Sequence, residues 1–90
     1  MLNVGVIGMG VGEKHALAYE NHQNTVLKTF CDFDKEKLSK LKIKFPNVSM
    51  DTNDQSILED KDIDIVSIAS FDNYHSDQII QALNNGKHVM

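Results

Sequence analysis

Two kinds of segment alternate along this 90-residue chain, and the alternation constrains the fold more than any other feature. Apolar, β-branched runs predict strands, and the segments between them have apolar residues at helical spacing. The most convincing strand, Ile63 to Ala69 (IDIVSIA), is nearly continuous in apolar residues, as in a parallel strand covered on both faces. The other expected strands are Leu2 to Ile7, Thr25 to Cys31, Val48 to Met50 and His88 to Met90.

The expected helices are Glu13 to His22, Lys35 to Phe45 and about Tyr74 to Asn84. Pro46 ends the second of them, and Gly86 is placed to cap the last. Thr52 and Gln55 have capping-box spacing, which predicts a further, brief helix. The whole order predicts an α/β fold: a doubly wound (Rossmann) parallel sheet of order 3-2-1-4-5 with helices on both faces.

Composition excludes several classes of protein. The chain has no arginine and a formal net charge of −4, which argues against a nucleic-acid partner. No apolar stretch approaches the ~20 residues of a membrane span, and the strand-like run from Leu2 leaves no room for a signal peptide. The single cysteine, Cys31, excludes a disulfide framework and a Cys-rich metal site. No metal is therefore expected, and the expected location is the reducing cytoplasm.

A glycine-rich segment, Gly8-Met9-Gly10-Val11-Gly12, lies between the first expected strand and the first expected helix. Glycine permits a tight turn and close approach of the backbone to a pyrophosphate, and the helix that follows offers free N–H groups. The pattern is G-x-G-x-G, with Glu13 where the dinucleotide fingerprint has its third glycine. A plain turn is the alternative, but the order of strand, loop and helix favours nucleotide binding.

An acidic residue, Asp32, ends the second expected strand 24 positions after Gly8. This is near the ~20-residue spacing at which an acid binds the adenosine ribose. The alternative role is to cap the next helix, which Asp34 fills equally well. An acid at this position without any arginine favours NAD over NADP. Lys35 and Lys37 could in principle bind a 2′-phosphate, but a lysine lacks the planar fork with which arginine binds phosphate, and both side chains can reach water.

The segment Ala69 to His75 (ASFDNYH) follows the most convincing strand, at the switch-point crevice of a doubly wound sheet. Asp72 or Asn73 can cap the helix that follows, and His75 can either pack in its first turn or face a ligand. The remaining histidines have no spacing that indicates a metal site: His15, His22 and His88.

These segments together resemble the glucose–fructose oxidoreductase / inositol dehydrogenase (Gfo/Idh/MocA) family along the whole chain. VGVIGMGVGEKHA looks like the family's opening strand, glycine loop and helix, and FCDFDKEKL looks like the acidic end of its second strand. IDIVSIASFDNYHSDQIIQALNNGKHV is similar to the family's DxVxIATPNxxHxxxxxxALxxGKHV segment, its most specific part. Here Ser70, Phe71 and Asp72 replace the usual Thr, Pro and Asn.

The resemblance implies the NAD-binding portion of an oxidoreductase that acts on a sugar, cyclitol or related hydroxy compound by hydride transfer. The implied cofactor contacts are Gly8, Gly10, Val11 and Gly12 on the pyrophosphate, Asp32 on the ribose, and Ser70, Asp72 and His75 near the nicotinamide. The family's catalytic lysine belongs to a Glu-Lys-Pro motif after the GKHV segment, beyond Met90. Residues 1–90 are therefore expected to be the N-terminal part of a dinucleotide-binding domain, without catalytic residues, inactive alone, and lacking the C-terminal substrate domain.

Two other functions stay open. The chain is alternatively a free-standing nucleotide-binding or redox-sensing module without catalysis, or an interaction domain that has lost its ligand. The glycine segment and Asp32 weigh against the interaction domain. A homo-oligomer is a further expectation, because His88 to Met90 would expose an apolar sheet edge.

Overall fold

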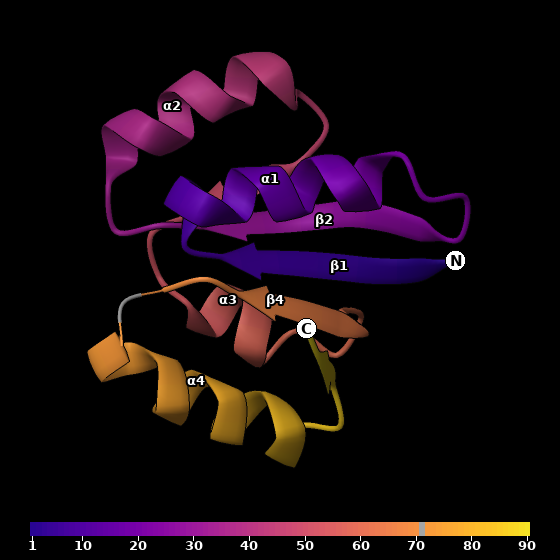
Figure 1. Cartoon of the computed structure of the whole chain (residues 1–90), viewed down its shortest axis with the longest axis vertical. Coiled ribbons are helices and arrows are strands. Elements are labelled where there is room, and N and C mark those ends of the chain that lie inside the picture. Colours follow the sequence, from indigo (N-terminus) through magenta and orange to yellow (C-terminus); the bar gives the residue numbers. More distant parts are fainter. Residues whose placement is uncertain (71) are drawn as a thin grey trace.

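The computed structural model describes residues 1–70 and 72–90, in which strands and helices alternate (Figure 1). The strands are β1 (Leu2–Ile7), β2 (Thr25–Cys31), β3 (Ser49–Asp51), β4 (Ile65–Ile68) and β5 (His88–Val89). The helices are α1 (Met9–Glu20), α2 (Lys35–Lys44), α3 (Gln55–Leu58) and α4 (Asp72–Asn84). Among these residues, no helix is both long enough and apolar enough to cross a lipid bilayer.

The strands form one parallel sheet in the order β3-β2-β1-β4-β5, which confirms the predicted topology. β1 is the central strand, and its Val4 is the register partner of Leu27 on β2 and of Ile65 on β4. Because the strands are parallel, their carboxyl ends meet at one edge of the sheet. In Figure 1 this edge lies on the left, where α1, α2 and α4 begin.

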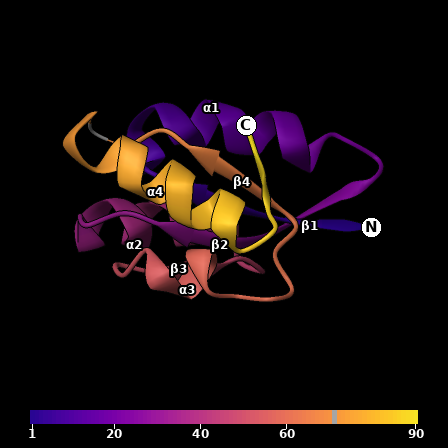
Figure 2. The same cartoon turned by 90° about the horizontal axis from the view of Figure 1, so that it is seen from below.

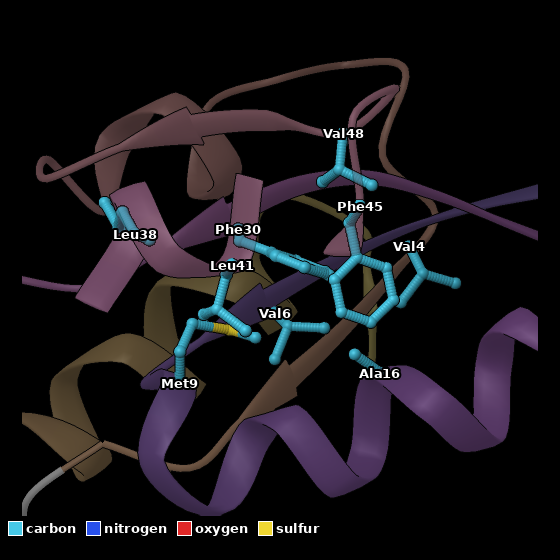
Figure 3. Packing of buried hydrophobic residues seen from close by; sticks show 9 residues of the cluster. All are labelled: Val4, Val6, Met9, Ala16, Phe30, Leu38, Leu41, Phe45 and Val48. Carbon is cyan, nitrogen blue, oxygen red and sulfur yellow. The ribbon is translucent and has the colours of Figure 1, made fainter. Parts of the chain in front are cut away.

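The two faces of the sheet carry separate apolar clusters. Val4 and Val6 of β1 face α1 and α2, where the ring of Phe30 meets that of Phe45 edge-on at 5.1 Å (Figure 3). Ile7, the next residue after Val6, faces α3 and α4 on the other side. Figure 2 shows α1 and α3 on opposite sides of the strands, so the prediction of helices on both faces is confirmed.

Several boundaries differ from the sequence-based expectation. α1 begins at Met9 rather than Glu13, so the glycine-rich segment forms its first turns instead of a loop. The predicted capping box at Thr52 and Gln55 is wrong, because the side chain of Asn53 accepts the hydrogen bond from the Gln55 N–H at 2.9 Å. β4 is shorter than the expected run, and α4 begins at Asp72.

Candidate functional site

A pocket of about 390 Å³ opens where the carboxyl ends of β1, β2 and β4 meet. Sheet order brings these ends together, because β1 lies between β2 and β4. Connections from β1 and β4 leave toward opposite faces of the sheet, and this arrangement is where doubly wound proteins bind ligands. Most of the residues predicted to bind a cofactor line the pocket: Gly8, Gly10, Val11, Asp32 and Ser70.

Gly8 joins β1 to α1 with a backbone conformation that other residues rarely adopt, a φ of +86°. A Cβ atom at this position would lie 2.5 Å from the carbonyl oxygen of Ala69 and 2.8 Å from the nitrogen of Ser70. The missing side chain therefore allows the segment after β4 to lie directly against the start of α1.

The start of α1 presents backbone N–H groups to the pocket. Its first helical hydrogen bond runs from Gly12 N to Gly8 O at 3.1 Å, so the N–H groups of Gly10 and Val11 precede the helical ladder. A Cβ atom on Gly10 would have the Lys37 Nζ, at 3.7 Å, as its nearest described neighbour. The space above Gly10 is therefore open to a ligand, and the positive end of the helix dipole favours an anionic one.

Gly12 has a packing role in this structure. It is buried, and a Cβ atom there would lie 2.9 Å from Cγ1 of Val6. This close approach of α1 to β1 is the contact that the third glycine of the dinucleotide fingerprint provides. The shorter glycine pattern thus keeps a close helix–strand contact, and the predicted contact of Gly12 with a pyrophosphate stays a prediction.

Asp32 connects the end of β2 to the start of α1. Its Oδ2 accepts a hydrogen bond from the Met9 N–H at 2.8 Å, and its Oδ1 accepts one from the Asp34 N–H at 2.9 Å. The cap of α2 is Asp34, whose side chain accepts from the N–H groups of Glu36 and Lys37. Asp32 is therefore not the cap, and its carboxylate has lone pairs left for hydroxyl donors in the pocket.

Of the two lysines that follow Asp32 closely in the sequence, only Lys37 lines the pocket. Lys35 is exposed, but Lys37 lines the pocket with its Nζ 3.8 Å from Oδ2 of Asp32. The lysine side chain is 43% exposed and that of Asp32 only 14%, so solvent screens the ion pair. Helical spacing alone did not show that the first turn of α2 lies beside the glycine segment.

Ser70 follows β4 and lines the pocket beside Gly8. Its hydroxyl donates a hydrogen bond to Oε1 of Gln78, a buried residue of α4 that the sequence analysis missed. The signal was present, because Gln78 precedes the buried Ala82 by one helical turn on the apolar face.

Two other residues after β4, Asp72 and His75, were predicted to lie near the cofactor. His75 lies half-buried in α4 and is not among the described residues that line the pocket. Phe71 and the side chain of Asp72 lie outside the described residues, so the predicted role of Asp72 stays a prediction. Within residues 1–70 and 72–90, no three His, Cys, Asp or Glu side chains lie close enough together to hold a metal ion.

Cys31 forms part of the pocket wall as a buried free thiol. Burial, and then the carboxylates of Asp54, Asp51 and Asp32, raise the pKa of this thiol to about 12. A thiol is reactive as the thiolate, so Cys31 does not supply a nucleophile to the pocket at neutral pH.

We expect Cys31 to resist alkylation by iodoacetamide at pH 8, by about 100-fold or more relative to the unfolded chain, because each pKa unit lowers the thiolate fraction about tenfold. Mass spectrometry of the native and urea-unfolded protein measures both rates. The raised pKa also means that stability is lost as pH rises from about 9 toward 12, where the unfolded thiol ionises first. Equal alkylation rates in the two states would contradict this prediction.

Comparisons with known proteins agree with this geometry. The model of the Gfo/Idh/MocA family, described as an oxidoreductase family with an NAD-binding Rossmann fold, matches residues 2–90. Myo-inositol 2-dehydrogenase of Thermotoga maritima is 28% identical over 98% of this chain and 27% of its own length. D-glucoside 3-dehydrogenase of Escherichia coli is 33% identical over 99% of this chain and 26% of its own length.

A solved structure, scyllo-inositol dehydrogenase from Lactobacillus casei with bound NAD(H) and scyllo-inositol, superimposes with a TM-score of 0.87. It is 28% identical to this chain, covering 99% of this chain and 27% of the solved one. The chain thus spans about a quarter of the length of these relatives.

Proposed function

The chain belongs to the Gfo/Idh/MocA family of oxidoreductases with an NAD-binding Rossmann fold, and from this premise we propose that it is the cofactor-binding part of a dehydrogenase. The proposed reaction transfers a hydride between the nicotinamide and a carbon that bears a hydroxyl group in a sugar, cyclitol or related compound. Similar proteins are named for inositol and for a glucoside, which supports this substrate class. We assign residues of this chain to cofactor binding, and none to proton transfer.

One observation carries the proposal: the backbone N–H groups at the start of α1 and the carboxylate of Asp32 line one pocket. A pyrophosphate fits the first group, because the N–H groups of Gly10 and Val11 precede the helical ladder. The described atom nearest to the Cβ position of Gly10 is the cationic Nζ of Lys37 at 3.7 Å, which leaves room for an anion. A ribose fits the second, since a carboxylate accepts hydrogen bonds from hydroxyls. The residues present therefore fit a dinucleotide.

Replacing Gly10 by alanine tests the proposal through two effects of opposite sign. Gly10 lies inside α1 and does not have a positive φ, so alanine should raise the free energy of unfolding by about 0.5 kcal/mol. The added methyl group would occupy the space proposed for the pyrophosphate. We expect NADH affinity, measured by calorimetric titration, to fall about tenfold, which corresponds to about 1.4 kcal/mol.

Gly86→Ala is the matched control, because this glycine follows α4 at the opposite end of that helix from the pocket. It should leave NADH affinity unchanged. Unchanged affinity in Gly10→Ala, or absence of NADH binding by the unmodified protein, would contradict the proposed function.

Three finer points belong to the same proposal. NAD is preferred over NADP, because Asp32 would repel a 2′-phosphate. The location is the cytoplasm, which agrees with the free thiol of Cys31. Association of copies of the protein into a homo-oligomer is the third point.

A further inference from the structure

A chain of polar side chains leads from the pocket to the side of the sheet that α3 and α4 cover. The Ser70 hydroxyl is bonded to Oε1 of Gln78, and Nε2 of Gln78 donates to Oδ2 of Asp54 at 3.0 Å. Oδ1 of Asp54 accepts a further hydrogen bond from the Gln55 side chain at 3.0 Å. Gln78 is 3% exposed, so water does not compete strongly for its amide group.

The charge of Asp54 determines the direction of the hydrogen bonds that connect it, through Gln78, to Ser70. An ionised carboxylate only accepts, so the group of Gln78 that faces Asp54 must be its NH₂. The amide oxygen of Gln78 then faces Ser70, and this oxygen also only accepts. The single hydroxyl proton of Ser70 is therefore committed to Gln78.

This commitment determines what Ser70 can offer to a ligand. Its oxygen has lone pairs left, and Ser70 lines the pocket beside Gly8. A ligand atom next to Ser70 must then supply an N–H or O–H group. A phosphate oxygen, which carries no proton to donate, is disfavoured there.

The sheet order indicates which donor this is. β4, which Ser70 follows, lies on the opposite side of β1 from β2, which Asp32 follows. A dinucleotide with its adenosine ribose on Asp32 and its pyrophosphate at the start of α1 continues toward Ser70 with its second ribose. On the basis of the proposed function, we infer that Gln78 is a positioning residue: held by Asp54, it turns Ser70 into an acceptor for a hydroxyl of the nicotinamide-side ribose.

Two ligands separate this role from a general structural one. ADP contains the adenosine and the pyrophosphate, whereas ADP-ribose adds the second ribose. We expect Ser70→Ala and Gln78→Met each to lower ADP-ribose affinity about fivefold to tenfold, as for one hydrogen bond, and to change ADP affinity less than twofold. The double variant should lose no more ADP-ribose affinity than Ser70→Ala alone, because Gln78 acts through Ser70.

Gln81→Met is the matched control. Gln81 lies on the same helix and hydrogen-bonds Gln55, which joins the network on the far side of Asp54 from Gln78. This variant removes a similar amide but leaves the bonds from Asp54 to Gln78 and from Gln78 to Ser70 in place. It should bind both ligands as the unmodified protein does. Titration calorimetry on the full-length protein measures all of these affinities.

Each other outcome overturns the inference. Equal losses of ADP affinity and of ADP-ribose affinity in Gln78→Met would show that Gln78 has a purely structural role. If the losses of ADP-ribose affinity in the two single variants add up in the double variant, Gln78 does not act through Ser70. If Ser70→Ala and Gln78→Met leave ADP-ribose affinity unchanged, neither residue belongs to the site. If the unmodified protein binds neither ADP nor NADH, the proposed function itself fails, and this inference fails with it.

Discussion

Replacing Gly8 by alanine is expected to lower the free energy of unfolding by about 3 kcal/mol or more. Two costs combine at this position. The φ of +86° is unfavourable for a residue with a side chain, and the new Cβ atom would lie 2.5 Å from the carbonyl oxygen of Ala69. That oxygen belongs to the backbone after β4, and the Ala69 N–H is bonded to the Ile7 carbonyl at 2.8 Å, so relief requires the sheet itself to move.

Gly86→Ala separates the two costs. Gly86 also has a positive φ, +77°, but no described atom lies within 4 Å of the position of its Cβ. In this variant the free energy of unfolding should fall only by the cost of the positive φ, about 1 kcal/mol. Urea denaturation followed by circular dichroism measures both losses, and similar values for Gly8→Ala and Gly86→Ala would refute the proposed collision with Ala69.

The topology was predictable because strand signals and helix signals do not overlap in this chain. The order of the sheet follows from the alternation and from the handedness of parallel connections, and neither depends on single residues. The start of α1 was not predictable from propensity. Glycines at positions 8, 10 and 12 disfavour a helix, yet Gly12 gains a close contact with Val6 that only a helix at this position provides.

The pocket was predictable where its residues follow strands, and less so where they come from helices. Asp32 and Ser70 are located by the ends of β2 and β4, so the sequence placed them near a ligand. Lys37 and Gln78 depend on how α2 and α4 pack against the sheet, which no local pattern encodes. The position of Gln78 on the apolar face of α4 indicated that it is buried, but its hydrogen bonds to Ser70 and Asp54 are visible only in the folded structure.

Full-length protein is expected to bind NADH about tenfold or more tightly than NADPH. Asp32 is held in place by the N–H groups of Met9 and Asp34, so its charge cannot turn away from a 2′-phosphate. Lys37 opposes this effect, because its Nζ lies 3.8 Å from Oδ2 of Asp32. The lysine side chain is the more exposed of the two and is flexible, and it lacks the planar fork with which arginine binds phosphate. The repulsion by Asp32 should therefore dominate, by about 1.4 kcal/mol or more, which corresponds to the tenfold preference.

Two single variants test this balance of charges. Lys37→Met removes the cation and should increase the preference for NADH, whereas Asp32→Asn removes the anion and should decrease it. Asparagine is the better substitution than alanine, because its side-chain oxygen can still accept the hydrogen bond from the Met9 N–H that holds the start of α1. Fluorescence titration with NADH and NADPH gives the ratio of the two affinities for the unmodified protein and for each of the two variants. Equal or tighter binding of NADPH by the unmodified protein would show that Lys37, and not Asp32, determines which cofactor the pocket accepts.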